Sequence, residues 1–279
     1  MSTIFDGKSY AEKKKYILQS GSDRARESGV IPHLATIVIG DNPASILYTN
    51  LKKKFIESLG CQVDIYNLLE NTNIKDIELL IKTLNEDETV HGIMVQFPLP
   101  EELSNLKEKI VSLIDATKDV DGLREISKFL HPTSKAVMEV LAMAIYETKI
   151  DVMTVCVVGS GGMVGKPLVK EFKKLGYIVL EADKDTENLK SLTLQADAVI
   201  SATGSMNLIS SDMVNDETIV IDVGSPYGDV QKEIVEKASF YTPVPGGVGP
   251  VTITCLAENL ILAATSTITS TEDVNPQES

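Results

Sequence analysis

Short apolar runs alternate along the first half of the chain with longer stretches in which apolar residues recur every three or four positions. The short runs predict strands at 34–39, 62–66 and 92–95, and the longer stretches predict one helix that ends at residue 59 and another over 74–84. Strands that alternate with helices are typical of a parallel sheet covered on both faces. The pattern therefore predicts an α/β domain in this half of the chain.

A second series of the same kind follows a helical stretch at 136–148. Its expected elements are strands at 152–158, 177–180, 198–201 and 219–223, with helices that end at 175 and near 194 between them. This order is Rossmann-like. We therefore expect two domains, 1–135 and 136–252, with a cleft between them and a last helix, 253–265, that packs back. Residues 266–279 are rich in Ser, Thr, Asp, Glu and Pro, and we expect them to be disordered.

The composition narrows the class of protein. With 43% hydrophobic residues in 279 positions, the chain can bury the cores of two α/β domains. A formal net charge of −14 argues against a nucleic-acid partner, because phosphate binding needs clustered Lys and Arg. We find no apolar run near the roughly 18 residues of a membrane span and no targeting segment, which predicts a cytoplasmic protein. The three Cys and three His are scattered singly and predict neither a disulfide nor a metal site.

A glycine-rich turn follows the first strand of the second series. It consists of Gly159, Ser160, Gly161, Gly162, Met163, Val164 and Gly165, and a helix resumes after it. Strand, glycine turn and helix together bring backbone N–H groups against a pyrophosphate, although the third glycine stands one position later than in the usual G-x-G-x-x-G. A dinucleotide site and a plain tight turn both remain open. Glu181 and Asp183 stand about twenty residues beyond the turn, where an acid either binds ribose hydroxyls or simply starts a loop.

The helix that ends at residue 59 carries the candidate for proton transfer. Asn42 and Pro43 form a helix-start signal. We expect the stripe Leu47, Leu51, Phe55 and Leu59 to be buried, since these residues repeat every four positions. Tyr48 and Lys52 stand four apart and share a face at the border of that stripe. Lys52 is therefore either a partly desolvated lysine with a lowered pKa or one of three solvated surface lysines.

Four segments in the same order decide between these alternatives. They are Ala44-Ser45-x-x-Tyr48-x-x-x-Lys52, the run 95–100 that contains Gln96, Lys118-Asp119-Val120-Asp121-Gly122, and the run 242–252 that contains Gly249 and Pro250. The chain resembles the bifunctional methylenetetrahydrofolate dehydrogenase/methenyltetrahydrofolate cyclohydrolase family from about residue 5 to 264. The resemblance implies a two-domain α/β fold, a folate substrate, a nicotinamide dinucleotide, a homodimer and no metal.

The resemblance also implies roles for individual residues. Lys52 matches the general acid/base, Tyr48 the tyrosine that packs on the aminobenzoyl ring, and Gln96 the residue that positions the lysine. Asp121 matches the carboxylate that holds the pterin, and Gly249 with Pro250 lines the folate site. The expected dinucleotide site comprises the turn 159–165 together with Asp183, Ala202, Thr203, Gly204 and Ser225.

The chain departs from the family at the cofactor and in one loop. The family usually has Gly-Arg-Ser in the glycine turn, where Arg and Ser bind the 2′-phosphate of NADP, and this chain has Ser160 and Gly161 there. Asp183 adds an acid nearby, so the sequence favours NAD, whereas the resemblance alone implies NADP. The segment after Gly122 is several residues shorter than in the family, which bears on substrate affinity and on the balance of the two activities.

We therefore expect an enzyme that oxidises 5,10-methylenetetrahydrofolate and hydrolyses the methenyl product to 10-formyltetrahydrofolate. One alternative is a monofunctional NAD-linked dehydrogenase, against which the retention of Lys52 and Gln96 argues. A more remote alternative is a catalytically silent dinucleotide-binding protein, suggested by the altered phosphate contacts.

Overall fold

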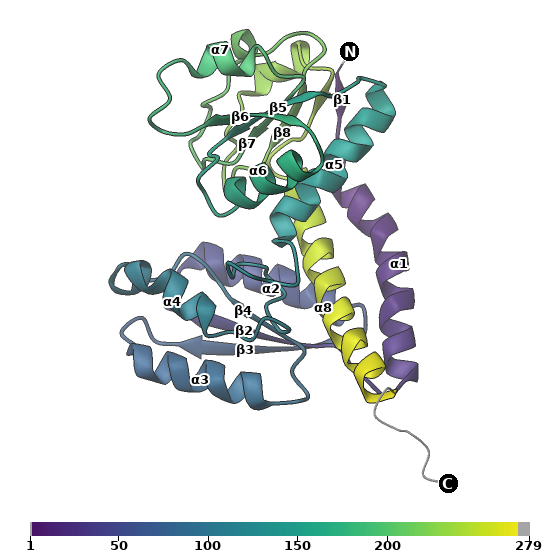
Figure 1. Ribbon diagram of the computed structural model, residues 1–279, viewed down its shortest axis with the longest axis vertical. Coiled ribbons are helices and arrows are strands. Elements are labelled where there is room, and N and C mark those ends of the chain that lie inside the picture. Colours follow the sequence, from purple (N-terminus) through teal and green to yellow (C-terminus); the bar gives the residue numbers. More distant parts are fainter. Residues whose placement is uncertain (1, 273–279) are drawn as a thin grey trace. The chain divides into compact units, whose positions relative to one another are not determined.

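The structure is a computed structural model that describes residues 2–272, with side chains described up to Ser266 (Figure 1). The chain forms two compact units. The first consists of the described residues up to Glu12 together with His131–Cys255, and we name it the six-stranded unit after its sheet. The second consists of Lys13–Leu130 together with the described residues from Leu256 onward, and we name it the three-stranded unit. Both sheets are entirely parallel.

The three-stranded unit has strand order β3-β2-β4. Its elements are β2 (His33–Ile39), α2 (Pro43–Glu57), β3 (Gln62–Leu68), α3 (Ile74–Glu86), β4 (Gly92–Val95), η1 (Glu101–Leu106) and α4 (Lys107–Ser112). Successive residues of β2 enter opposite cores: Leu34 packs in a cluster with Ile56 of α2, and Ala35 packs in a cluster with Ile77 of α3. This alternation buries both faces of the sheet, as a parallel sheet requires.

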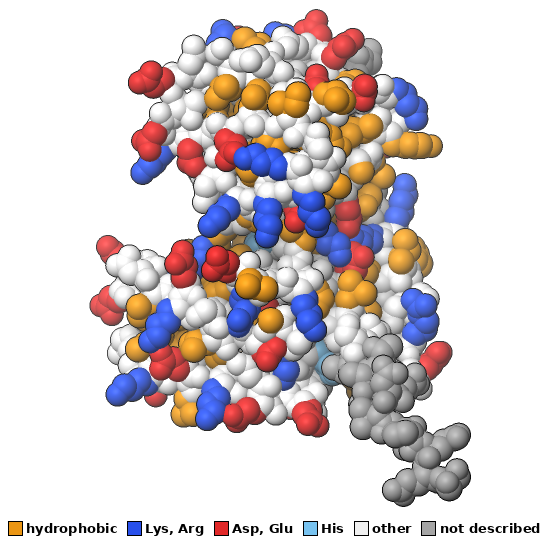
Figure 2. Space-filling model, viewed as in Figure 1, with side chains coloured by type: hydrophobic (Ala, Val, Ile, Leu, Met, Phe, Trp, Pro, Cys, Tyr) orange, Lys and Arg blue, Asp and Glu red, His pale blue; other side chains and the backbone are white. Residues whose placement is uncertain are grey.

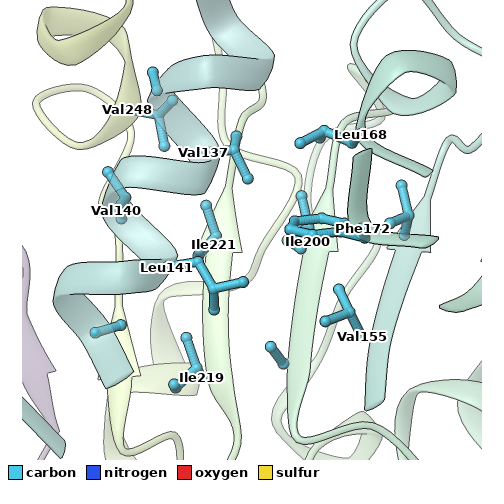
Figure 3. Packing of buried hydrophobic residues seen from close by; sticks show 14 of the residues in the cluster. Val137, Val140, Leu141, Val155, Leu168, Phe172, Ile200, Ile219, Ile221 and Val248 are labelled. Carbon is cyan, nitrogen blue, oxygen red and sulfur yellow. The ribbon is translucent and has the colours of Figure 1, made fainter. Parts of the chain in front are cut away.

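The six-stranded unit has strand order β1-β9-β8-β7-β5-β6. Its elements are β1 (Thr3–Ile4), α5 (Pro132–Thr148), β5 (Thr154–Val158), α6 (Gly165–Lys174), β6 (Ile178–Ala182), α7 (Leu189–Thr193), β7 (Ala198–Ser201), η2 (Ser211–Met213), β8 (Ile219–Asp222), η3 (Lys232–Glu236) and β9 (Phe240–Tyr241). Helices α5 and α6 contribute Leu141 and Phe172 to the core on one face, where Leu141 lies beside Ile221 and Phe172 beside Ile200 of the sheet (Figure 3). The other face has its own cluster, which includes Cys156 and Val199. The predicted two-domain α/β class is confirmed.

Two long helices are divided between the units. Helix α1 (Gly7–Glu27) passes from one unit to the other after Glu12, and α8 (Val248–Glu272) does so after Cys255. The sequence assigned no element before residue 34, so α1 and β1 were missed. Helix α8 begins five residues before the expected start, because a proline is tolerated in the first turn of a helix, where its missing N–H has no intrahelical partner. It also continues through 266–272, where we expected disorder, and the rest of that expected tail, 273–279, lies outside the described residues.

The two units differ from the expected domains: the described residues up to Glu12 belong to the six-stranded unit, although we expected them in the first domain, 1–135. The division falls between Leu130 and His131, so that all of α5 belongs to the six-stranded unit, whereas we expected a boundary after 135. The expectation about membrane length also needs a correction. The segment Val248–Ser266 is long and apolar enough to span a membrane by length and composition alone, but 61% of it is buried. Its residues Val251 and Leu260 belong to the cores of the two units, which explains the apolar composition.

Candidate functional site

Helix α2 presents a polar face to the sheet. Asn42 caps the helix as predicted, since its Oδ1 accepts from the N–H groups of Ala44 and Ser45 at 3.0 and 3.1 Å. The predicted buried stripe is wrong in its first two members, because Leu47 and Leu51 are 58% and 44% exposed. The buried residues of this helix are instead Ser45, Thr49 and Ile56. The prediction assumed that apolar residues mark the inward face of the helix, whereas this face carries the polar residues Ser45 and Thr49 together with Lys52.

Lys52 lies on this inward face and contacts Gln96, the first residue after β4. The Nζ atom of Lys52 donates to Oε1 of Gln96 at 3.0 Å. The amide of Gln96 in turn donates through Nε2 to the carbonyl of Phe97 at 2.7 Å. This second bond fixes which end of the amide faces the lysine. The structure therefore brings together the two residues that the sequence named as general acid/base and as its positioning partner.

The environment of Lys52 changes its acidity. Burial lowers the pKa of Lys52 below the ordinary lysine value of 10.5, and the negative charge of Asp121 opposes part of this change. A lysine with a lowered pKa gives up a proton more readily and can regain one near neutrality. Of the two interpretations left open by the sequence, the structure supports the desolvated lysine. Tyr48 is half-buried one turn earlier on the same helix.

Asp121 stands in a loop that is held by neighbours on both sides. Lys118 donates through Nζ to the carbonyls of Leu84, Asn85 and Asp87 at the end of α3. Asp119 is fully buried and accepts from the backbone N–H groups of Leu123 and Arg124 at 3.3 and 3.0 Å. Asn259 of α8 donates to the carbonyl of Val120 at 2.9 Å and to that of Leu130 at 3.0 Å. These contacts order the shortened segment after Gly122.

Sequence reasoning missed Asp119 and Asn259 as supports of this loop. In the sequence, Asp119 was identified only as a member of the matched segment 118–122, and no role of its own was assigned to it. Asn259 lies almost 140 positions further along the chain, in a helix that was identified only by its apolar residues. Its signal was the one amide side chain in a largely apolar helix, because an amide calls for hydrogen-bond partners when it is buried.

The predicted site residues Gly249 and Pro250 lie in the first turn of α8, in the six-stranded unit. Gly249 is exposed and Pro250 is half-buried. The turn before them approaches Gly7 so closely that a Cβ on Gly7 would lie 1.8 Å from the carbonyl oxygen of Gly247. Their contribution to a folate site stays a prediction.

The glycine turn after β5 has no room for side chains at two of its positions. Gly159 has φ +87°, and a Cβ there would lie 2.6 Å from the carbonyl oxygen of Ala202. A Cβ on Gly165 would lie 2.0 Å from the carbonyl oxygen of Gly159. Helix α6 starts at Gly165, so its N-terminus directly follows the turn. A tightly packed glycine turn that is followed directly by a helix N-terminus fits a pyrophosphate.

The structure also distinguishes the two acids that follow β6. Glu181 pairs with Lys173 at 2.5 Å. Asp183 instead faces the glycine turn, and its Oδ2 accepts from the N–H of Gly161 at 2.9 Å. This contact follows from the sheet register, since Val158 pairs with Ala182 and places the two strand ends side by side. Backbone hydrogen bonds from Gly161 and Lys184 lower the pKa of Asp183, which therefore carries a negative charge at neutral pH.

The remaining predicted dinucleotide residues lie at the same edge of the sheet. Ala202, Thr203 and Gly204 follow β7, and Ser225 follows β8 by three residues. Strands β8, β7 and β5 are neighbours and parallel, so the loops at their carboxyl ends meet. This edge of an open α/β sheet is where such folds bind their ligands.

Comparison with known proteins agrees with this arrangement, in which the three-stranded unit carries Lys52 and the six-stranded unit carries the glycine turn. Residues 5–121 match the family model "Tetrahydrofolate dehydrogenase/cyclohydrolase, catalytic domain", and residues 131–268 match the NAD(P)-binding domain of the same family. The two units thus define a two-domain α/β enzyme with a nicotinamide-dinucleotide-binding domain. The chain belongs to the tetrahydrofolate dehydrogenase/cyclohydrolase family.

Individual relatives support the same conclusion. The bifunctional protein FolD of Campylobacter jejuni is 38% identical over 94% of this chain and 98% of its own length. The crystal structure of the Campylobacter jejuni enzyme matches with a TM-score of 0.89 at 37% identity, covering 96% of this chain and all of that one. The Trypanosoma brucei dehydrogenase-cyclohydrolase, complexed with NADP and an inhibitor, matches with a TM-score of 0.87 at 27% identity, covering 96% of this chain and 98% of that one.

Proposed function

We propose that this protein oxidises 5,10-methylenetetrahydrofolate with a nicotinamide dinucleotide and then hydrolyses 5,10-methenyltetrahydrofolate to 10-formyltetrahydrofolate. The observation that carries the proposal is the hydrogen bond between Lys52 and Gln96, made by a lysine whose pKa is lowered by burial. Family membership supports both activities. The glycine cradle fits a dinucleotide, which supplies a hydride acceptor when bound.

The two reactions make different demands on the protein. Hydride loss is assisted by the folate's own nitrogen lone pair, so the protein needs chiefly to orient the substrate, a role for Tyr48 and Asp121. Hydrolysis adds the oxygen of water to the methenyl carbon and breaks the bond from this carbon to a ring nitrogen, which must gain a proton. The water oxygen becomes the formyl oxygen and loses both of its protons: one is released to solvent, and the other replaces the proton that the general acid gives to the ring nitrogen. Lys52 can donate that proton from Nζ while Gln96 keeps the ammonium directed. The presence of this hydrogen-bonded pair favours the bifunctional enzyme over a monofunctional dehydrogenase.

The proposal has a direct test. The purified protein is mixed with methylenetetrahydrofolate and either NAD or NADP while cofactor reduction is followed, and methenyltetrahydrofolate is supplied separately while its hydrolysis is followed. We expect both activities. Reduction without hydrolysis would identify a monofunctional dehydrogenase, and dinucleotide binding without either activity would identify a silent binding protein.

We propose NAD as the preferred dinucleotide. This proposal is supported by Asp183, whose negatively charged carboxylate faces the glycine turn and accepts a hydrogen bond from the N–H of Gly161. A 2′-phosphate brought to this place would meet a like charge and would find Ser160 instead of an arginine. Lys184 follows Asp183 directly and is the one cation in this segment that could offset the repulsion.

We propose a cytoplasmic homodimer, as family resemblance implies, without nucleic-acid or membrane partners. The net charge of −14 supports the absence of nucleic acid, and on the visible face of each unit Lys and Arg side chains stand among Asp and Glu side chains (Figure 2). Strand β6 is an edge strand of the larger sheet, and its residue Ile178 is 57% exposed. The backbone groups of an edge strand can pair with a second copy of the chain, which supports the proposed homodimer.

Replacement of Asp121 by alanine is expected to weaken folate binding. A charged hydrogen bond contributes about 1.5 to 3 kcal/mol, so the dissociation constant for the folate should rise by roughly 10- to 150-fold. Glu125→Ala removes an exposed carboxylate from the same loop and serves as the matched control. Titration with folate and with NAD measures both affinities. A loss of NAD affinity with folate binding intact would show that Asp121 does not belong to the folate site.

A further inference from the structure

A buried carboxylate outside the predicted site residues connects the loops at the dinucleotide edge of the six-stranded unit. Asp229 has no exposed surface. Its Oδ2 accepts from the hydroxyl of Ser201 at 2.9 Å, from the N–H of Thr203 at 2.7 Å and from the hydroxyl of Thr203 at 2.9 Å. Three donors from the end of β7 and the loop after it thus converge on one oxygen atom.

The backbone of Asp229 is held in turn by Asp222, the last residue of β8. The N–H of Asp229 donates to Oδ1 of Asp222 at 3.0 Å, and Asp222 is also fully buried. Asp222 further accepts from the N–H groups of Gly224 and Val230 at 2.8 and 3.0 Å. The two carboxylates therefore fix the loops after β7 and β8 with respect to each other.

The loop that Asp229 holds also packs against the glycine turn. Thr203 accepts from the N–H of Ser205 at 3.0 Å while it donates to Asp229, so the loop 203–205 is closed on the carboxylate. The carbonyl of Ala202 and Cγ2 of Thr203 occupy the space where Gly159 lacks a Cβ, at 2.6 and 3.3 Å from that position. A shift of the loop would therefore move the atoms against which the glycine turn packs.

Burial of this charge needs a reason, because removing a carboxylate from water costs several kcal/mol unless hydrogen bonds offset the cost. The compensation here is one-sided: Oδ2 receives three bonds, whereas Oδ1 has no hydrogen-bond partner among the residues that the structure describes. A buried polar atom without a protein partner calls for an explanation, and a functional role is one such explanation.

We propose that Asp229 is a positioning residue for the dinucleotide: it holds the Thr203 loop, and through it the glycine turn at Gly159, in the conformation that receives the cofactor. This proposal rests on the proposed function for the location of the dinucleotide. Asp229 does not touch the cofactor, because its side chain is completely enclosed by the protein.

The test measures dinucleotide affinity directly, by calorimetric titration of the folded protein with NAD and with NADP. In Asp229→Ala all three acceptor contacts are lost, and we expect the dissociation constant of the preferred dinucleotide to rise about tenfold or more. Asp229→Asn keeps an accepting oxygen, and we expect an affinity within about threefold of the wild type. Asp212→Asn removes an exposed carboxylate of the same unit, paired with Lys190, and should change nothing.

Hydrolysis of methenyltetrahydrofolate provides the internal control, because that reaction needs no dinucleotide. We expect Asp229→Ala to retain it. If Asp229→Ala does not fold, Ser201→Ala removes one of the three donors from a fully buried position, and we expect it to weaken dinucleotide binding by about threefold.

Unchanged dinucleotide affinity in folded Asp229→Ala, or in Ser201→Ala where Asp229→Ala does not fold, overturns the proposal. So does a parallel loss of hydrolysis and dinucleotide affinity, which would show a purely structural role. A wild-type protein that binds neither NAD nor NADP would instead contradict the proposed function.

Discussion

Lys52→Met is expected to abolish hydrolysis of methenyltetrahydrofolate while part of the hydride transfer remains. General acid catalysis by a positioned side chain contributes roughly 10²- to 10⁴-fold, and methionine has no proton to donate. Methionine keeps most of the lysine's apolar length, so the buried inward face of α2 remains filled. The rates of hydrolysis and of cofactor reduction, measured on the same preparation, separate the two effects.

Lys54→Met supplies the control, because Lys54 is an exposed lysine two positions further along α2. Hydrolysis near the wild-type rate in Lys52→Met would contradict the assignment. The pH dependence gives a second measurement. Burial lowers the pKa of Lys52, and the protonated form is lost as the pH rises through that pKa. The rate of enzymatic hydrolysis should therefore decline with rising pH, and the midpoint of this decline should lie below the ordinary lysine value of 10.5. An alkaline decline that persists unchanged in Lys52→Met would have to come from another group.

Ser160→Arg combined with Asp183→Ser is expected to move cofactor preference from NAD toward NADP. The double change supplies the arginine that forks onto a 2′-phosphate and removes the carboxylate that occupies the N–H of Gly161. A gained charged hydrogen bond and a lost repulsion together amount to about 2 to 4 kcal/mol, which corresponds to roughly 30- to 1000-fold in the ratio of kcat/KM values. The ratio of kcat/KM for NAD and NADP in each variant measures the shift.

Asp185→Ser is the matched control for this experiment. Asp185 is an exposed carboxylate two positions beyond Asp183, and its removal lowers the local negative charge equally. We expect little change in preference, because the effect depends on the contact with the turn rather than on net charge. A wild-type enzyme that already favours NADP would show that Lys184 or another cation binds the phosphate, and that Asp183 does not exclude it.

The strands were the most predictable part of the fold. Each predicted strand lies within two residues of an observed one at both ends, because runs of β-branched residues bounded by turns have few other structures open to them. The missed helix α1 is the opposite case. It is 21 residues long and mostly polar, so its apolar residues give little periodic signal, and part of its burial depends on residues far along the chain, such as Ile261.

The site was predictable only where a motif named it. Lys52 and Gln96 were paired from the resemblance, and the structure adds the bond between them. The register of α2 could not be predicted from apolar residues, because Ser45 and Thr49 are buried in place of leucines. The role of Asp183 over Glu181 depended on the strand register, which the sequence does not display. Asp229 was not singled out, because a single acid between Gly228 and Val230 has no sequence signal of burial.

The crossings of the chain between the two units limit how the protein can be divided. The chain passes from one unit to the other at Glu12–Lys13, Leu130–His131 and Cys255–Leu256. A fragment 131–255 would lose β1 and leave the edge of β9 without its partner, while a fragment 13–130 would lose Leu256 and Leu260 and expose the cluster around Leu34 and Met94. Neither unit can therefore be cloned, exchanged or inherited as one continuous segment. Both units must therefore be made as parts of one chain before either has a complete core.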